Sequence, residues 1–379
     1  MTAVTAAARR WVGAGRWRRL SLFLAAGFVA LVLCPALLSD FRLGLLAKYF
    51  CFAIVAVGVD LVWGYGGMLT LGQGLFFGMG GYAMGMMLKL QEAGRDGLPD
   101  FMSYNGLTEV PGFWKPFAHS WFALPAAVIL PMLLAAGLGA LVFRQRVRGA
   151  YFAILTQALA AAFVILLIGQ QGYTAGTNGL TNMRTLFGYD LNDPVNQRSL
   201  YFVVAVALGA VFLLARQLVQ SRYGKLLVAV RDSEDRVRFL GYSPTKVKVL
   251  AFTVSAGMAG LAGALFVPVV GIMSPALLGI VPSLELVIGV ALGGRATLVG
   301  AVAGTVLVGY AKTGLSENYP SGWLYFQGAL FIIVVAFAPK GLAGIWKGVK
   351  NLRDRRRGAV APPAPVTTAE PQTALEPVR

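Results

Sequence analysis

The sequence predicts an all-α membrane protein of about ten transmembrane helices, some of them broken by glycine or half-length, with one short helix in a cytoplasmic loop. Of its 379 residues, 57% are hydrophobic and only 13% are charged. A soluble domain carries roughly 25% charged residues. Long apolar runs recur along the chain, and most Lys and Arg residues lie in clusters between those runs. The surface of this protein must therefore be covered largely by a bilayer.

Each expected crossing needs about 20 apolar residues. Two of the apolar regions, Gly66–Leu88 and Ser283–Tyr310, are interrupted by glycines. The basic residues before the first run are typical of a signal peptide, but the run is too long and lacks a small-residue cleavage site, so we expect a retained helix. The continuous runs are Leu20–Leu38, Leu43–Trp63, Trp121–Phe143, Ala150–Gly169, Leu200–Leu218, Val247–Val270 and Trp323–Ala338.

The positions of the basic clusters predict the orientation, because Lys and Arg are retained in cytoplasmic loops. All the clusters lie inside if Gly66–Leu88 crosses once and Ser283–Tyr310 crosses twice, turning near Gly293 and Gly294. This gives ten crossings with both termini in the cytoplasm. It also explains the net charge of +17 without nucleic-acid binding. The clusters are Arg9–Arg19, Arg144–Arg148, Arg216–Lys248 and Lys340–Arg357.

Three regions follow from this pattern. Residues 1–19 are a basic cytoplasmic N-terminus, and residues 20–346 are the transmembrane domain, with a long inner loop at 220–248. Residues 347–379 form the C-terminal tail, which from about Gly358 is rich in Pro, Ala and Thr and has almost no aromatic residues. Such a segment cannot bury enough apolar surface to fold, so we expect a disordered cytoplasmic tail.

Several kinds of chemistry are excluded by the residues that the sequence lacks. The two cysteines, Cys34 and Cys51, lie inside apolar runs, and His119 is the one histidine, so we expect no metal site and no cofactor. No phosphate-binding G-x-x-x-x-G-K-[ST] motif and no H-E-x-x-H or G-x-S-x-G motif occurs. The chain is therefore predicted to be neither an ATPase nor a hydrolytic enzyme.

The glycine-rich stretch Gly64–Gly85 is the first candidate functional segment. Glycine weakens a helix, so its abundance here needs a compensating role. Pairs such as Gly74 and Gly78 allow close helix packing, and a broken helix at membrane depth can line a path. Both interpretations stay open. Thr70, Gln73 and Gly74 are the residues that we place nearest a translocation path.

The second candidate segment, Glu285–Gly300, predicts two half-length crossings around a turn at Gly293 and Gly294. Short, glycine-interrupted segments in transporters indicate the translocation region. Glu285 is an ionisable group near membrane depth and hence a candidate path residue, although an acid is also common where a helix begins.

Three other isolated charges have simpler interpretations. Lys48 and Lys89 can extend to an interface. Asp60 lies one turn from the predicted inner end of its helix, so we expect it to cap or pair.

The inner loop predicts a short helix of about two turns. Asp232 or Ser233 fits the N-cap, Gly241 fits the position after the last turn, and Pro244 follows. Exposed apolar residues on such a helix suit docking into a groove of a cytosolic partner, but an ordinary loop helix would have similar features. The candidate residues are Arg231, Asp232, Ser233, Glu234, Asp235, Arg236, Val237, Arg238, Phe239, Leu240 and Gly241.

Taken in order, the stretches Gly64–Gly85, Gly224–Leu265 and Gly293–Gly300 resemble the permease subunits of the branched-chain amino acid ABC importers. The resemblance covers roughly residues 41–344. The outer-loop residues Leu98–Met102 and Val110–Trp114, with Ser316–Tyr325 and Ala338–Leu342 later in the chain, are most similar to the urea-type permease subunit.

The resemblance implies a multi-pass subunit of the bacterial inner membrane that forms the translocation path for urea or short amides. It also implies the partners: a second homologous permease, two cytosolic ATPase subunits and an extracytoplasmic solute-binding protein. The loop helix would be the coupling helix that contacts an ATPase. The alternative cargo is a branched-chain amino acid, and the alternative class is a stand-alone secondary transporter or channel.

Overall fold

The computed structural model of the protein describes most of the membrane-spanning domain. The expected N-terminal and C-terminal regions (1–19 and 347–379), most of the first apolar run and most of the last one lie outside the described residues. The described residues are 34–94, 97–147 and 149–319, together with Leu31, Gly322, residues 325–329 and Ile332.

The described part of the chain is all-α, as predicted, apart from one hairpin of two-residue strands, Thr185–Leu186 (β1) and Tyr189–Asp190 (β2). The long helices are α3 (Asp40–Val59), α4 (Gln73–Ala93), α6 (Ser120–Arg144), α7 (Ala150–Gly169), α9 (Pro194–Gln220), α12 (Pro244–Val270) and α14 (Leu298–Asn318). The shorter ones are α2 (Cys34–Leu37), the π-helix η2 (Asp60–Tyr65), α5 (Asp100–Tyr104), η3 (Lys115–Ala118), α8 (Gln171–Thr174), α10 (Arg222–Asp232), α11 (Glu234–Phe239), η4 (Pro275–Leu278) and α13 (Ile280–Gly293).

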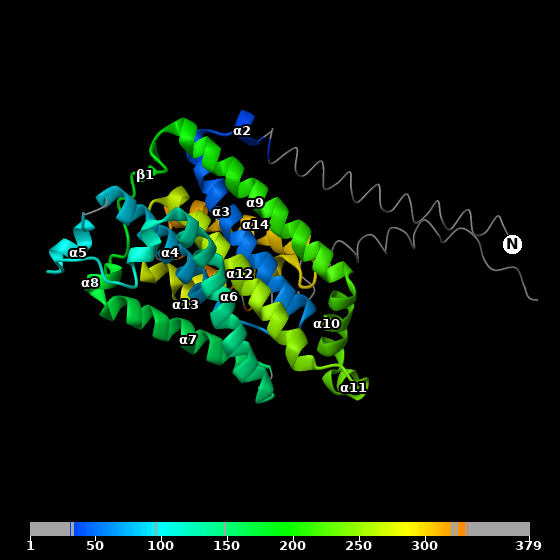
Figure 1. Cartoon of the computed structure of the whole chain (residues 1–379). Coiled ribbons are helices and arrows are strands. Elements are labelled where there is room, and N and C mark those ends of the chain that lie inside the picture. Colours follow the sequence, from blue (N-terminus) through cyan, green and yellow to red (C-terminus); the bar gives the residue numbers. More distant parts are fainter. Residues whose placement is uncertain are drawn as a thin grey trace, which may run out of the picture.

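Helix α12 is the centre of the bundle and packs against α3, α4 and α6 (Figure 1). Glycines bring the backbones of α4 and α12 into contact. A Cβ on Gly80 would collide with the carbonyl oxygen of Gly260, and one on Gly263 would collide with that of Phe77. Small residues at such positions let two helices approach closely. In a bilayer, van der Waals packing rather than the hydrophobic effect stabilises contacts between helices. The core of the described bundle therefore depends on backbone proximity.

Six described helices are long and apolar enough to cross a membrane. They are Asp40–Tyr65, Ser120–Arg144, Ala150–Gly169, Pro194–Gln220, Pro244–Val270 and Leu298–Glu317. Helix α4 has 21 residues and is buried along nearly its whole length, but its glycines and Gln73 make it less apolar. Of the ten expected crossings, eight therefore correspond to described helices once α4 and α13 are included.

The pair α13–α14 differs from the expectation of two half-length crossings. Helix α13 has 14 residues, so it is roughly 21 Å long and shorter than the bilayer core of about 30 Å. Helix α14 has 21 residues and is full-length. Only α13 is half-length, because the second helix continues past its expected end at Tyr310, through a more polar segment, to Asn318.

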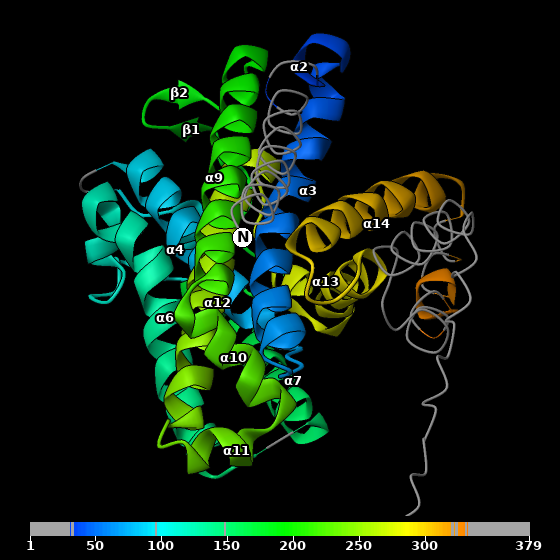
Figure 2. The ribbon, with the colours of Figure 1, turned by 90° about the vertical axis from the view of Figure 1, so that its right-hand side faces the viewer.

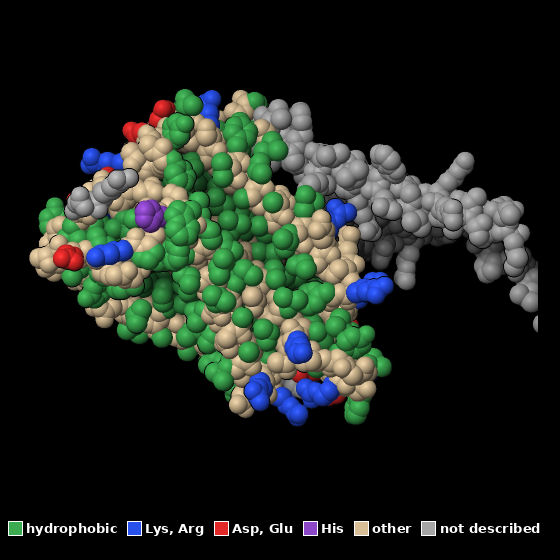
Figure 3. All heavy atoms as spheres, viewed as in Figure 1, with side chains coloured by type: hydrophobic (Ala, Val, Ile, Leu, Met, Phe, Trp, Pro, Cys, Tyr) green, Lys and Arg blue, Asp and Glu red, His purple; other side chains and the backbone are tan. Residues whose placement is uncertain are grey.

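The two ends of the bundle differ from its middle. Figure 2 shows α3 and α9 side by side, with α10 and α11 at one end and α2 and the β1–β2 hairpin at the other. Hydrophobic side chains cover most of the middle of the face seen in Figure 3, whereas charged side chains lie toward the ends, with a group of Lys and Arg beside α11. This distribution matches a protein whose middle contacts lipid.

Candidate functional site

The glycine-rich stretch begins with non-helical backbone that separates two membrane helices, α3 with its extension η2 and α4. Helix α3 continues as the π-helix η2 (Asp60–Tyr65), residues 66–72 are not helical, and α4 begins at Gln73. Single-turn π-helical insertions occur frequently at functional sites.

Two of the three path candidates on this stretch are enclosed by the bundle. Gln73 donates from Nε2 to the hydroxyl of Ser255 on α12, at 3.1 Å, and Thr70 is fully buried. Neither residue lines the cavity described next. The structure therefore places Thr70 and Gln73 in helix packing and does not bring them to the remaining path candidates.

A cavity of about 410 Å³ lies between α3, α4, η4, α13 and α14. Gly74 and Glu285, both predicted path residues, line it. A Cβ on Gly74 would collide with the carbonyl oxygen of Leu278, at 2.5 Å, so glycine at this position lets α4 pack closely against η4. The packing role and the cavity-lining role of Gly74 thus coexist.

The cavity contains charges at membrane depth. Glu285 Oε1 lies 2.6 Å from Lys312 Nζ, in an ion pair between α13 and α14. Lys48 of α3 lines the same cavity and has no ion pair or hydrogen bond with the described residues. Intramembrane ionisable groups are costly and usually functional. Apolar side chains complete the wall: Leu45, Phe52, Phe77, Leu277, Leu286 and Val308.

Gly293 and Gly294 lie elsewhere, where α13 turns into α14. A Cβ on Gly293 would collide with the carbonyl oxygen of Gly300, and Gly294 has a φ of +109° that side-chain-bearing residues rarely adopt. These two glycines therefore close the α13–α14 hairpin and do not line the cavity. The predicted turn is present, and the path role of Gly293 and Gly294 stays a prediction.

The inner loop forms two helices instead of one. The predicted coupling segment is divided, because Arg231 and Asp232 end α10 and a separate helix, α11, runs over Glu234–Phe239. Ser233 is the residue between them, and it makes no side-chain hydrogen bond as N-cap of α11. Gly241 has a φ of +84°, as its predicted position after the helix requires.

Helix α10 is attached to both neighbouring membrane segments. The hydroxyl of Tyr223 donates to the carbonyl oxygen of Val247 on α12, at 2.8 Å, and burial raises the pKa of this phenol. Arg231 Nη1 donates to the carbonyl oxygen of Gly64 in η2, at 2.9 Å.

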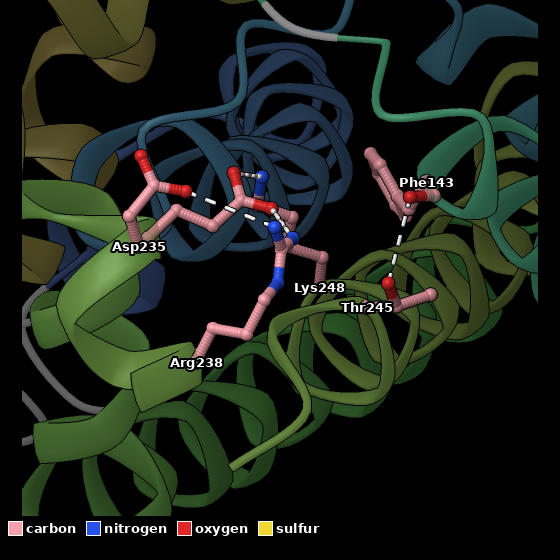
Figure 4. A network of polar contacts seen from close by, with 6 residues as sticks. Phe143, Asp235, Arg238, Thr245 and Lys248 are labelled. Atoms are coloured by element: carbon pink, nitrogen blue, oxygen red, sulfur yellow. Dashed lines mark hydrogen bonds and ion pairs between the residues drawn. The ribbon is translucent and has the colours of Figure 1, made fainter. Parts of the chain in front are cut away.

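Ion pairs hold α11 on the start of α12 (Figure 4). Glu234 lies 2.6 Å from Lys248, and both side chains are only 10% exposed. Arg238 extends between Glu234 and Asp235, at 3.3 Å and 3.7 Å. These contacts turn one side of α11 toward the protein, where Val237 is buried.

The outward side of this loop is apolar. Phe239 is 92% exposed and Leu240 is 75% exposed, and Tyr242 is also exposed. Basic Arg236 stands on the same helix. Large apolar side chains exposed together, with charges around them, are typical of an interaction surface. We call Phe239, Leu240 and Tyr242 the α11 surface.

Sequence reasoning missed three contributors. Lys48 and Lys312 were isolated charges in apolar runs, which is itself a signal of function, yet Lys48 was interpreted as extending to an interface. Asp60 was expected to cap or pair near the end of its own helix, but its partner is the distant Ala296, whose backbone N–H donates to Asp60 Oδ1 at 2.7 Å. A contact across 236 positions leaves no local pattern in the sequence.

Comparison with known proteins points in one direction. The sequence profile described as "Branched-chain amino acid transport system / permease component" matches residues 41–335. The chain is 28% identical over 343 residues to the high-affinity branched-chain amino acid transport system permease protein LivM of Salmonella typhimurium, covering 85% of this chain and 74% of that protein. It is 25% identical over 308 residues to LivH of the same organism, covering 77% and 91%.

Similarity extends beyond these amino acid permeases. The ribose import permease protein RbsC of Escherichia coli is 26% identical over 227 residues, covering 57% of this chain and 67% of that protein. No solved structure matches the chain.

An all-helical, multi-pass bundle with a broken helix, a charged cavity and an apolar surface on a loop helix defines an integral membrane protein of the transport class. The match over residues 41–335 makes the assignment specific. The chain belongs to the family of permease components of branched-chain amino acid transport systems.

Proposed function

We propose that this chain is one of the membrane subunits of an ABC importer that carries branched-chain amino acids. In this assembly a second, homologous permease completes the path, two cytosolic ATPase subunits hydrolyse ATP, and an extracytoplasmic protein delivers the solute. The chain lies in the bacterial inner membrane with both termini in the cytoplasm, so α10 and α11 face the cytosol.

The α11 surface is the observation that carries the coupling role. Phe239 and Leu240 are exposed at the end of a helix that ion pairs fix to α12. Apolar side chains that are held in a fixed position on a helix are suited to insertion into a groove of a partner protein. Motion of the ATPases would then reach the transmembrane bundle as rigid-body displacement, giving alternating access. A channel or secondary transporter would not require such a surface.

The composition of the cavity supports the amino acid as cargo. Lys48, with no ion pair in the described part of the chain, can attract a carboxylate, and Glu285 can attract an ammonium group. Phe52 and Phe77 offer an apolar wall to a branched side chain. The printed names of the LivM and LivH relatives agree with this cargo.

Urea is the second candidate, and the comparisons support it less well. It stays a prediction that rests on the outer-loop residues Leu98–Met102 and Val110–Trp114. Phe113 and Trp114 line a separate cavity of about 460 Å³ near α7 and α8. Urea is neutral and would not require the charges that surround Lys48.

The test is uptake of radiolabelled leucine and urea by cells that express the whole transport system. We expect leucine uptake to be lost in Leu240→Asp, because a charge placed in an apolar contact disrupts docking. Lys48→Met should reduce leucine uptake about tenfold if a carboxylate contact is removed. The matched control is Lys225→Met, which should behave normally because the Lys225 side chain is exposed on α10 and lies outside the membrane spans.

The possible outcomes separate the candidates. Loss of the ATPases on purification of Leu240→Asp, at normal membrane levels, supports the coupling surface. If cells take up urea but not leucine, and Lys48→Met does not change the urea uptake, the cargo is urea and not an amino acid. Transport that continues without the ATPases would contradict the importer itself.

A further inference from the structure

Two hydrogen bonds connect the inner loop to the cavity-lining hairpin through η2. The first runs from α10 to η2. Arg231 Nη1 donates to the carbonyl oxygen of Gly64 at 2.9 Å, and the aliphatic part of Arg231 lies so close to Gly67 that a Cβ there would collide with it. The guanidinium of Arg231 thus holds the end of the broken helix.

The second hydrogen bond runs from η2 to the α13–α14 turn. Asp60 Oδ1 accepts from the backbone N–H of Ala296 at 2.7 Å, and Asp60 is fully buried. Ala296 has a φ of +58°, a left-handed conformation that costs free energy for a residue with a Cβ. The carboxylate of Asp60 therefore fixes a turn whose backbone would otherwise relax.

Gly64 is the point at which the two hydrogen bonds meet. Its carbonyl oxygen accepts from Arg231, while its Cα lies against the second contact, so that a Cβ would collide with both Asp60 Oδ1 and the nitrogen of Ala296. On the same π-helix, the ring of Trp63 lies 4.8 Å from the guanidinium carbon of Arg295. The π-helix is thus clamped between α10 and the hairpin turn.

We propose that Arg231, Gly64, Asp60 and Ala296 form a mechanical linkage that transmits motion of the ATPase-facing loop to the α13–α14 hairpin. The hairpin carries Glu285 and Lys312, which line the cavity, so displacement of α10 changes the cavity. The proposal rests on the proposed coupling function. Arg231 and Asp60 act as positioning residues: they contact neither the cargo nor ATP.

The geometry favours transmission over simple stabilisation. Helix α10 is attached to η2 through a charged hydrogen bond, which is directional and stronger than a neutral one. The π-helix deviates from regular α-helical bonding, as is frequent at functional sites. Since Gly64 leaves no free space between its neighbours, a shift of α10 must move the turn.

The experiment uses the full chain in the complete importer and measures movement and transport together. Cys34 and Cys51 are replaced by alanine, and Ser316→Cys, which lines the cavity, reports access to a maleimide reagent. We expect ATP with vanadate to change the labelling rate several-fold in this parent. In Arg231→Met, with the ATPases still bound, this change should disappear, and leucine uptake should fall about tenfold.

Four further variants sharpen the result. Gly64→Ala should uncouple in the same way, because its methyl group separates Asp60 from Ala296. Asp60→Asn keeps an acceptor oxygen and should retain most coupling, whereas Asp60→Leu should lose it. Lys225→Met removes an exposed cation from the same helix without touching η2 and should behave like the parent.

Failure of the linkage and failure of the proposed function give different results. If Arg231→Met binds the ATPases and keeps both its uptake and its ATP-dependent labelling, the linkage is wrong while the importer stands. If the parent chain binds no ATPase and takes up solute without ATP, the proposed function is wrong and the linkage falls with it. Normal ATP hydrolysis with lost labelling change and lost uptake supports the linkage.

Discussion

Glycine performs distinct tasks at different positions of this chain. At Gly80 it brings α4 against α12, at Gly74 it lets α4 approach η4 beside the cavity, and at Gly294 it permits a positive φ. The residue type is the same at each position, but the atoms that lie next to the glycine decide what it contributes to the structure. The consequence of adding one methyl group should therefore differ from site to site.

Gly80→Ala should destabilise the protein, because its Cβ would meet the carbonyl oxygen of Gly260 and push α4 away from α12. We expect a loss of about 1–3 kcal/mol in the free energy of unfolding, as for an overpacked core. Thermal unfolding of the purified chain in detergent measures it. Gly137→Ala is the matched control, since nothing lies within 4 Å of a Cβ there; equal melting temperatures for both variants would refute the packing argument.

At the scale of elements, the α11 helix is too short to be stable by its own hydrogen bonds. It has 6 residues, and isolated helices of fewer than about 12 residues are marginal in water. Its position depends on buried Val237 and on the ion pair between Glu234 and Lys248. The α11 surface is therefore presented correctly only while that pair is intact.

Glu234→Gln should release α11 from α12. Lys248 would keep its charge in a site that is 10% exposed, and breaking a buried pair in this way costs about 3–5 kcal/mol. We expect trypsin to cleave faster after Arg236 and Arg238, which electrophoresis of the digest measures. We also expect weaker binding of the ATPases. Asp235→Asn, at an exposed acid of the same helix, should change little; unchanged cleavage in Glu234→Gln would show that the pair does not fix α11.

At the scale of the whole molecule, charge and helix length lead us to expect the two ends of the bundle on opposite sides of the membrane. The β1–β2 hairpin lies at one end and α11 lies at the other (Figure 2). The proposed orientation puts the hairpin outside and α11 inside, in accordance with the positive-inside rule.

Labelling in intact cells tests this orientation. In a chain with Cys34 and Cys51 replaced by alanine, Tyr189→Cys should react with a membrane-impermeant maleimide added outside, because this side chain is exposed on β2. Tyr242→Cys should react only after the cells are permeabilised. The reverse pattern would invert the topology and remove the α11 surface from the ATPases.

The class of the protein, most crossings, the non-helical stretch before α4, the glycine turn and the short loop helix could all be predicted from the sequence. These features follow from local composition: apolar length, glycine density and capping residues act over a few positions. The position of Gly241 after α11 is one example, since its φ of +84° suits glycine.

Which residues meet across the bundle can be seen only in the folded protein. Glu285 pairs with Lys312 at 27 positions' separation, and Asp60 reaches Ala296 across 236. Thr70 and Gln73, which were expected near the path, do not line the cavity, whereas Lys48 does. Helix rotation and packing determine which face of an apolar helix turns inward, and in a chain that is apolar on nearly all sides the hydrophobic pattern does not encode that choice.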